Sequence, residues 1–169
     1  MRPEAPADRS TVHAVNAAAF GRPDEADLVD CLRATAAWVD GLSLVAVEPD
    51  GAIVGHLLLS RVDVVGPDEQ ARLVLSLAPM AVRPDRQGAG VGSALVRAAI
   101  AAADARGEPL IVVLGHAGFY PRFGFVPASG HGIVAPWPVP DEVYLVRPLT
   151  NDDPAIRGTV RYPACFDAV

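Results

Sequence analysis

Hydrophobic residues in the first 35 positions repeat at intervals of three and four, the spacing of amphipathic helices. One such stretch lies between Asp8, which can cap a helix, and Gly21, which can end one. A second stretch starts at Pro23 and Asp24. The positions expected to face a core are Val12, Val15 and Ala19 in the first stretch and Leu28, Cys31, Leu32 and Thr35 in the second. The chain is therefore predicted to begin with two helices packed on a core.

Further along, the pattern changes to runs of β-branched and leucine residues separated by turn residues. SLVAVE (43–48) and AIVGHLLLSRVDV (52–64) flank the turn PDG (49–51), which predicts an antiparallel hairpin. A third strand, RLVLSLAPMAV (72–82), follows a polar loop. Proline has no N–H to donate to a sheet, so Pro79 within this strand predicts a bulge or an opening between neighbouring strands.

A crossover unit is predicted after the third strand. Glycines at 88, 90 and 92 lead into a helix with an apolar stripe from Leu95 to Ala103, which begins near Ser93 and stops at Gly107. The buried strand PLIVVLGH (109–116) comes next. This order normally places two parallel strands side by side with the helix on one face. The later elements expected are a surface loop (129–140), a strand YLVRPL (144–149) and a short strand TVRY (159–162).

These elements predict one mixed α/β domain. Its sheet is expected to be mainly antiparallel and splayed at a central parallel pair, with helices on both faces. Residues 1–150 are expected to form the domain, and 151–169 a C-terminal tail packed on it. A chain of 169 residues with 51% hydrophobic content can bury a core of that size.

The charge balance narrows the function. A net charge of −6 argues against a broad nucleic-acid-binding surface, which needs clustered basic residues. All 14 basic residues are arginine, so chemistry that needs a lysine amine is excluded and anions would be met by guanidinium groups. Arg83 and Arg86, which flank the glycine-rich turn, are the candidates, with a merely solvated loop as the alternative.

The sequence also predicts a cytoplasmic location. No apolar stretch reaches the roughly 18 residues of a membrane span, and the N-terminus does not resemble a signal peptide. Cys31 and Cys165 lie far apart with no C-x-x-C spacing, which favours reduced thiols over a disulfide. Cys31 is expected to fill the core.

The segment QGAGVGS (87–93) has the features of a phosphate cradle. Its glycines let backbone N–H groups approach an anion, and the helix that follows adds the positive end of its dipole. A Walker A loop does not fit because there is no lysine, and a Rossmann fingerprint does not fit because Ser93 stands at the sixth position. The alternative is a turn that merely packs tightly.

The same residues resemble the GNAT superfamily of N-acetyltransferases. The segment 87–92 is similar to its [R/Q]-x-x-G-x-[G/A] signature, which binds the pyrophosphate of acetyl-coenzyme A (acetyl-CoA). The strand SLAPMAV (76–82) resembles the family's bulged fourth strand, whose backbone pairs with the pantetheine arm. GFYPRFGF (118–125) resembles its Y-x-x-x-G-F element. The resemblance covers about the first 150 residues and is strongest from 75 to 125.

The resemblance implies acetyl transfer from acetyl-CoA to an amine on a small molecule or peptide. It implies that Tyr120 assists the departing thiolate; the alternative is an amphipathic core residue with its hydroxyl at the surface. The cofactor-binding residues would be Met80, Ala81, Val82, Gln87, Gly88, Ala89, Gly90, Val91, Gly92 and Ser93. His116, at the end of a predicted strand and near Tyr120, is the candidate base; alternatively it is a structural imidazole or a coenzyme contact. Other candidates for the base are His56, Ser76 and a water chain, with His56 expected to be a core histidine. No set of metal ligands is evident, so no metal is expected.

Two departures from the family pattern leave a second function open. Gln87 stands where arginine is commoner, and the strand 76–82 carries no acidic residue that could act as a base. The alternative is an acetyl-CoA-binding sensor or regulatory module without turnover. The acceptor is unidentified, and the oligomeric state is open, with a homodimer as one alternative. Neither nucleic acid nor a membrane is expected as a partner.

Overall fold

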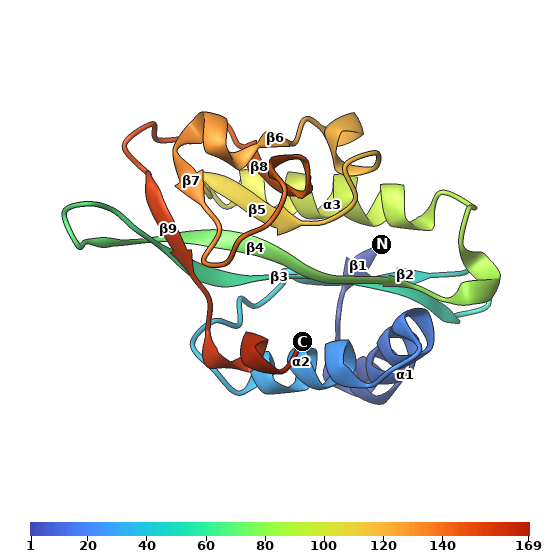
Figure 1. Ribbon diagram of the computed structural model, residues 1–169. Coiled ribbons are helices and arrows are strands. Elements are labelled where there is room, and N and C mark those ends of the chain that lie inside the picture. The colour runs from blue at the N-terminus through green and yellow to red at the C-terminus, as the bar shows by residue number, and fades with distance from the viewer.

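A nine-stranded sheet crosses the molecule between two layers of helix (Figure 1). The computed structural model describes all residues from 1 to 169. Helices α1 (Arg9–Phe20) and α2 (Asp24–Arg33) cover one face of the sheet, and α3 (Val91–Ala105) covers the other. The prediction of a mixed α/β fold with helices on both faces is thereby confirmed.

The sheet has a central path of seven strands in the order β1-β2-β3-β4-β5-β8-β6, and β9 pairs with both β3 and β7. The strands are β1 (Arg2–Pro3), β2 (Ser43–Val47), β3 (Ile53–Val65), β4 (Ala71–Val82), β5 (Leu110–Leu114), β6 (Val126–Pro127), β7 (Ile133–Val134), β8 (Tyr144–Pro148) and β9 (Gly158–Arg161). Short 3-10 helices connect them: η1 (Pro6–Asp8), η2 (Pro84–Arg86), η3 (Tyr120–Phe123), η4 (Ala128–His131), η5 (Asp141–Val143) and η6 (Ala164–Ala168).

Pro79 produces the predicted bulge. Leu57 of β3 pairs with Met80 of β4, and Leu59 pairs with Leu77, so two residues of β4 lie opposite one residue of β3. Such a bulge bends its strand and increases the local twist. The backbone at this point therefore turns away from a regular ladder.

The central parallel pair is short. β4 and β5 are in register at only two positions, Leu75 with Ile111 and Ser76 with Val112. β4 continues beside β3 as far as Val82, whereas β5 ends at Leu114. The sheet is thus open between the carboxyl-terminal parts of these strands, as the fold prediction required.

Both faces of the central sheet are buried, and successive residues of β3 serve opposite faces. Leu57 belongs to the cluster beneath α3, together with Leu95. Leu58 belongs to the cluster beneath α1 and α2, together with Val12 and Leu32. The helix spacing read from the sequence therefore identifies the core-facing residues of α1 and α3 well.

The stretch from 129 to 140, predicted to be a surface loop, is more ordered than expected. It includes β7, whose Ile133 is almost fully buried, and β7 pairs with β9 in parallel. The partner strand lies far along the chain, in the tail, and also pairs with the end of β3. The composition of residues 129–140 does not indicate that β7 pairs with β9, so the prediction of a surface loop was wrong for Ile133–Val134.

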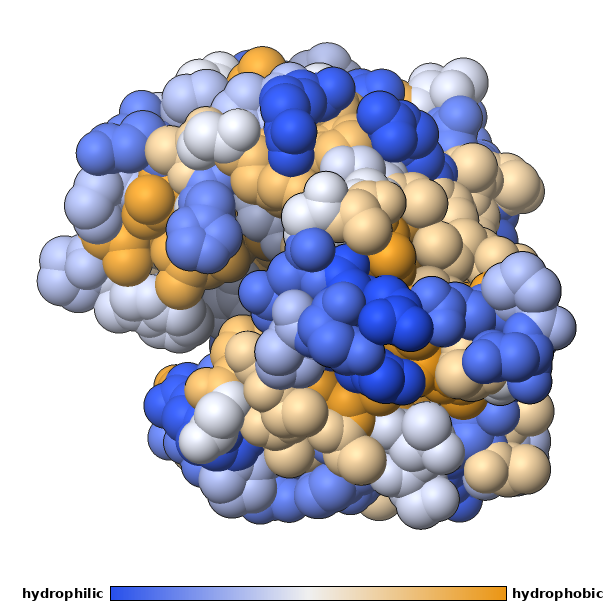
Figure 2. Space-filling model, turned by 90° about the vertical axis from the view of Figure 1, so that its right-hand side faces the viewer, coloured by the Kyte–Doolittle hydropathy of each residue, from blue (hydrophilic) through white to orange (hydrophobic).

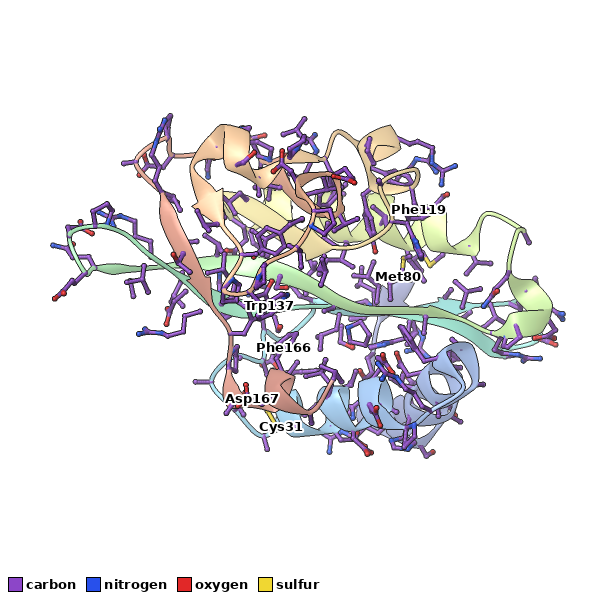
Figure 3. All side chains as sticks on the ribbon, viewed as in Figure 1. Cys31, Met80, Phe119, Trp137, Phe166 and Asp167 are labelled. Atoms are coloured by element: carbon purple, nitrogen blue, oxygen red, sulfur yellow. A yellow bond between two sulfur atoms is a disulfide. The ribbon has the colours of Figure 1, made fainter.

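The prediction of two reduced cysteines was also wrong. Cys31 and Cys165 form a disulfide with their Cα atoms 5.9 Å apart, and Cys31 lies on the exposed side of α2 rather than in the core. Their separation of 134 residues gave no hint of this, because β9 leads the chain back so that η6 packs against α2 (Figure 3). No helix has both the length and the apolar character needed to cross a membrane.

Substitution of Cys165 by serine is expected to lower the free energy of unfolding by about 2–4 kcal/mol, because the bond closes a long loop in the unfolded chain. Urea denaturation of the oxidised proteins measures the difference. Reductant should destabilise the original chain by a similar amount and leave the variant unchanged. Equal stability of the oxidised proteins would contradict the expectation.

Candidate active site

The glycine-rich segment connects η2 to α3 at the open end of the sheet. Helix α3 starts at Val91, two residues earlier than expected, and Gly90 is its N-cap with φ +85°. Gly88 also has a positive φ, +76°, and open space surrounds the Cβ position of each. Only glycine adopts this backbone freely, which explains why the segment gives up side chains here.

The backbone amides of this segment are free. No N–H from Gln87 to Ser93 donates a hydrogen bond to another group of the chain, whereas the Gly90 carbonyl accepts the first α3 bond from Ala94, at 3.0 Å. The Gln87 side chain donates to the Val82 carbonyl at 3.1 Å and so joins the loop to β4. Free amides at a helix N-terminus form an anion-binding site.

A cavity of about 570 Å³ lies over these amides. It is lined by Met80, Val82, Arg86, Gln87, Gly88, Gly90, Val91, Gly92, Ser93, His116, Phe119 and Arg122. We call it the loop cavity. A Cβ on Gly92 would lie 3.6 Å from Met80 Cε and 3.7 Å from the Phe119 ring, so these two side chains flank the start of α3 (Figure 3). The cavity is large enough for an extended ligand to lie along β4 and reach the amides.

The loop cavity contains all but two of the residues predicted to bind the cofactor. Ala81 is buried on the opposite face of β4, in the cluster beneath α1 and α2, because side chains alternate along a strand. Ala89 lies exposed in the loop and is not part of the lining. The Ala81 side chain therefore does not line the cavity.

The arginines near the glycine-rich segment differ from the expectation, and of the two predicted ones only Arg86 lines the loop cavity. Both Nε and Nη2 of Arg83 donate to Asp85, and Arg86 pairs with Asp85 and Glu48 at 2.8 Å. Acidic residues thus already engage the two predicted anion contacts. Arg122, which the sequence analysis did not single out, lies over the Phe119 ring at 4.6 Å and has no acidic partner. The sequence could have indicated Arg122, because it is the only charged residue in GFYPRFGF.

A second cavity, of about 390 Å³, lies on the other side of the opening and is mostly apolar. Its lining comes from the end of α1, the α1–α2 connection, α2, β4, the end of β5 and the residues after it, η3, the loop after β7 and the C-terminal segment: Phe20, Arg22, Glu25, Leu28, Ser76, Leu77, Ala78, Pro79, Met80, Leu114, Gly115, His116, Tyr120, Trp137, Tyr162, Phe166 and Val169. We call it the aromatic cavity. Met80 and His116 line both cavities, so the two meet there.

The space-filling view shows the end of the molecule at which α3 begins. A deep notch separates an upper from a lower part of the surface, and hydrophobic residues gather on its upper edge (Figure 2). The notch agrees with the opening between β4 and β5, where the ladder stops after two residue pairs. A ligand can enter the opening from solvent at this end.

Tyr120 lies in η3 and is only 6% exposed, with its ring edge-on to Phe119 and Phe125 at 5.1 and 5.4 Å. Burial raises the pKa of its phenol to about 12. The group is therefore protonated throughout the physiological range and can act as a hydrogen-bond donor in the aromatic cavity.

Gly115 makes room for the Tyr120 ring. A Cβ at position 115 would lie 2.2 Å from Tyr120 Cε2, inside van der Waals contact. Gly115→Ala is therefore expected to displace the ring and to destabilise the protein by about 1–3 kcal/mol, the usual range for overpacking. Gly118→Ala, with no atom within 4 Å of the added carbon, is the matched control. Urea denaturation of both variants tests this, and equal stabilities would contradict it.

The candidate bases occupy different environments. His116 is exposed, follows β5 and lies with Tyr120 on the aromatic cavity. Ser76 also lines this cavity. His56 is fully buried between Asn16 and Ser43, at 3.0 and 2.9 Å, and burial, then the Arg33 charge, lowers its pKa to about 3. His56 is thus a neutral core histidine that lines neither cavity.

Potential metal ligands gather elsewhere. His13, Asp27 and Asp30 form a partly exposed group on α1 and α2. His13 pairs with Asp30 at 2.9 Å, and none of the three lines either cavity. This group is therefore not part of the candidate active site.

Comparison with known proteins agrees with this geometry. The model of the Acetyltransferase (GNAT) family matches residues 11–125. The Escherichia coli protein described as "Uncharacterized N-acetyltransferase YjhQ" is 39% identical over 158 residues, covering 91% of this chain and 86% of that protein. "Uncharacterized N-acetyltransferase YhbS" of the same organism is 32% identical over 171 residues, covering 99% and 98%.

Solved structures show the same architecture. YhbS from E. coli in complex with CoA superposes with a TM-score of 0.88 at 29% identity, over 98% of this chain and 90% of that one. A GNAT family acetyltransferase from Brucella melitensis in complex with acetyl-CoA gives 0.79 at 33% identity, over 98% and 96%. With a matching family model, relatives covered almost end to end and the same opened sheet, the chain belongs to the GNAT family of acetyltransferases.

Proposed function

We propose that the protein transfers the acetyl group of acetyl-CoA directly to an amine. The observation that carries this proposal is the meeting of two cavities at Met80 and His116, one over free backbone amides and the other containing Tyr120. Acetyl-CoA supplies an activated thioester. The relatives with CoA and acetyl-CoA in their structures support the loop cavity as its site.

The loop cavity suits the anionic part of that molecule. The amides from Gln87 to Ser93 can bind its diphosphate together with the α3 dipole. Arg122 has no acidic partner and can offer a planar pair of donors. Between this site and Tyr120, the edge of β4 that faces away from β3 lacks a strand partner after Ser76 and can pair with an extended pantetheine arm.

Tyr120 would act by hydrogen bonding. A thiolate with pKa ~8.5 does not take a proton fully from a phenol whose pKa is about 12. The phenol can, however, donate a hydrogen bond to the sulfur as negative charge develops there. Its burial removes competing water and strengthens that bond.

His116 would accept the proton of the amine, directly or through a water molecule. Its side chain reaches the boundary of the two cavities, where donor and acceptor would meet. A neutral imidazole nitrogen can accept a proton from an amine. No carboxylate on β4 between Ser76 and Val82 competes for this role.

The lack of a carboxylate on β4 between Ser76 and Val82 also supports the second candidate function, an acetyl-CoA-binding sensor without turnover. One experiment separates the two. The purified protein is mixed with acetyl-CoA and a panel of amines, aminoglycosides and peptide N-termini while free thiol and melting temperature are followed. Thiol release that depends on an amine supports the transferase. Stabilisation without release across the panel supports the sensor, and no stabilisation by coenzyme contradicts both.

We also propose the cytoplasm as the location, since acetyl-CoA is its expected substrate. Disulfides are rare in a reducing cytoplasm, so this location predicts that Cys31 and Cys165 are thiols in the cell although the structure joins them. Rapid alkylation of thiols in lysed cells, followed by mass measurement of the chain, shows whether the bond is present there. The location is thus tested separately from the reaction.

A further inference from the structure

Three aromatic side chains form one wall of the aromatic cavity. The rings of Trp137 and Tyr162 are 5.3 Å apart, and those of Tyr162 and Phe166 are 4.8 Å apart. All three line the cavity, and Figure 3 shows Phe166 between η6 and the sheet with Trp137 above it. Trp137 is 41% exposed, so part of its surface is available to a ligand in the cavity.

This wall is held in place independently of any ligand. The Tyr162 and Tyr144 hydroxyls are hydrogen-bonded to each other at 3.1 Å. Phe166 follows Cys165, which is joined to α2 by the disulfide, and packs on the cluster beneath α2. A preformed wall loses little conformational entropy when a flat group packs on it.

Glu25 and Arg22 also line the cavity, and Asp24 lies beside them outside the lining; together these three side chains carry one net negative charge. Glu25, in the first turn of α2, is only 8% exposed, and its Oε2 accepts a hydrogen bond from Arg22 Nε at 3.1 Å. Arg22 also pairs with Asp24 at 3.1 Å, so two carboxylates share one guanidinium. The remaining group in the lining that can become positive is His116. A cation is therefore favoured over an anion.

We propose that the acceptor is a primary amine joined by a short chain to an aromatic ring, a proposal that rests on the acetyl transfer described above. The ring packs against Trp137, Tyr162 and Phe166, and Glu25 attracts the ammonium group into the cavity. In the transfer the bond between nitrogen and the acetyl carbon forms and the carbon–sulfur bond breaks. Of the two protons that the ammonium loses, one reaches the departing sulfur and the other reaches solvent.

The test compares acceptors with and without a ring. With acetyl-CoA saturating, thiol release by the full chain is measured with 2-phenylethylamine, n-butylamine and ethanolamine. We expect kcat/KM for 2-phenylethylamine to exceed the other two by about tenfold or more, the factor that about 1.4 kcal/mol of ring burial gives. This comparison needs no variant and so does not depend on the folding of one.

Variants then assign the residues. Phe166→Leu keeps apolar volume but removes the ring, and Glu25→Gln removes the charge. Each should raise the KM for 2-phenylethylamine by about tenfold and leave the KM for acetyl-CoA unchanged. Glu142→Gln, on an exposed residue outside both cavities, is the matched control and should change neither. Melting temperatures with acetyl-CoA verify that each variant is folded.

The outcomes distinguish a wrong acceptor class from an absence of acetyl transfer. Equal kcat/KM for the three amines, or preference for ethanolamine, would overturn the acceptor class while acetyl transfer itself stands. If both variants keep the preference for 2-phenylethylamine and the original KM for it, the roles of Phe166 and Glu25 are overturned. Coenzyme binding without thiol release from any amine would overturn the transferase and the acceptor class with it.

Discussion

Gly90→Ala is expected to weaken acetyl-CoA binding by about tenfold to hundredfold. The residue has φ +85° at the N-cap of α3, and an alanine there costs about 1–2 kcal/mol, so the loop is expected to relax away from this geometry. The amides from Gln87 to Ser93 would then no longer point at a common anion. Loss of one hydrogen bond to a charged group is worth about 1.5–3 kcal/mol, which corresponds to the stated range. Calorimetric titration with acetyl-CoA measures it.

Gly41→Ala is the matched control for this change. Gly41 has φ +82°, with its nearest neighbour, Arg106 Nη1, at 4.0 Å from an added Cβ, and it lines neither cavity. Both variants should lose similar stability in urea, but only Gly90→Ala should lose coenzyme affinity. If both bind acetyl-CoA like the original chain, the amides of the loop are not the diphosphate site.

Tyr120→Phe is expected to lower kcat by about a hundredfold, within the usual range for loss of a proton-donating group. The dissociation constant of acetyl-CoA should stay the same, because the phenol lines the aromatic cavity and not the loop cavity. The phenylalanine ring keeps the edge-on contacts with Phe119 and Phe125, so folding is preserved. Single-turnover thiol release with saturating coenzyme measures the effect, and a full rate would remove Tyr120 from the mechanism.

The pH dependence gives a second test of Tyr120. A donor whose pKa is raised keeps its proton until the pH passes that raised value, here about 12. The rate should therefore rise as the acceptor amine loses its proton and should not fall again up to about pH 10, near the ordinary phenol pKa of ~10. A decline between pH 8 and 10 that is absent in Tyr120→Phe would contradict the burial of this hydroxyl.

The sequence predicted those parts of the fold that depend on local pattern. The spacing of apolar residues identified the buried faces of α1, with Val12 and Val15, and of α3, with Leu95. This was possible because the helical period is a pattern among residues close in sequence. Pro79 indicated the bulge because the missing N–H is a property of the residue itself. The glycines at 88 and 90 indicated the loop because only their backbone adopts a positive φ freely.

The parts that were missed depend on contacts between distant segments. The pairing of β7 with β9 and the Cys31–Cys165 bond both require knowing where the tail returns in space. The charge environment of Arg86 was missed for the same reason, since Glu48 lies at the turn between β2 and β3, 38 residues away in the sequence. Ion pairs, sheet edges and cavity walls are tertiary properties that one-dimensional periodicity does not encode.

The shared boundary at Met80 and His116 has a kinetic consequence. Because each reactant has its own cavity, both can reside on the protein at once, and the chain has neither a free cysteine nor a lysine to hold the acetyl group in between. Turnover should accordingly proceed through a ternary complex. Initial-rate lines at several fixed concentrations of one reactant would then converge rather than run parallel.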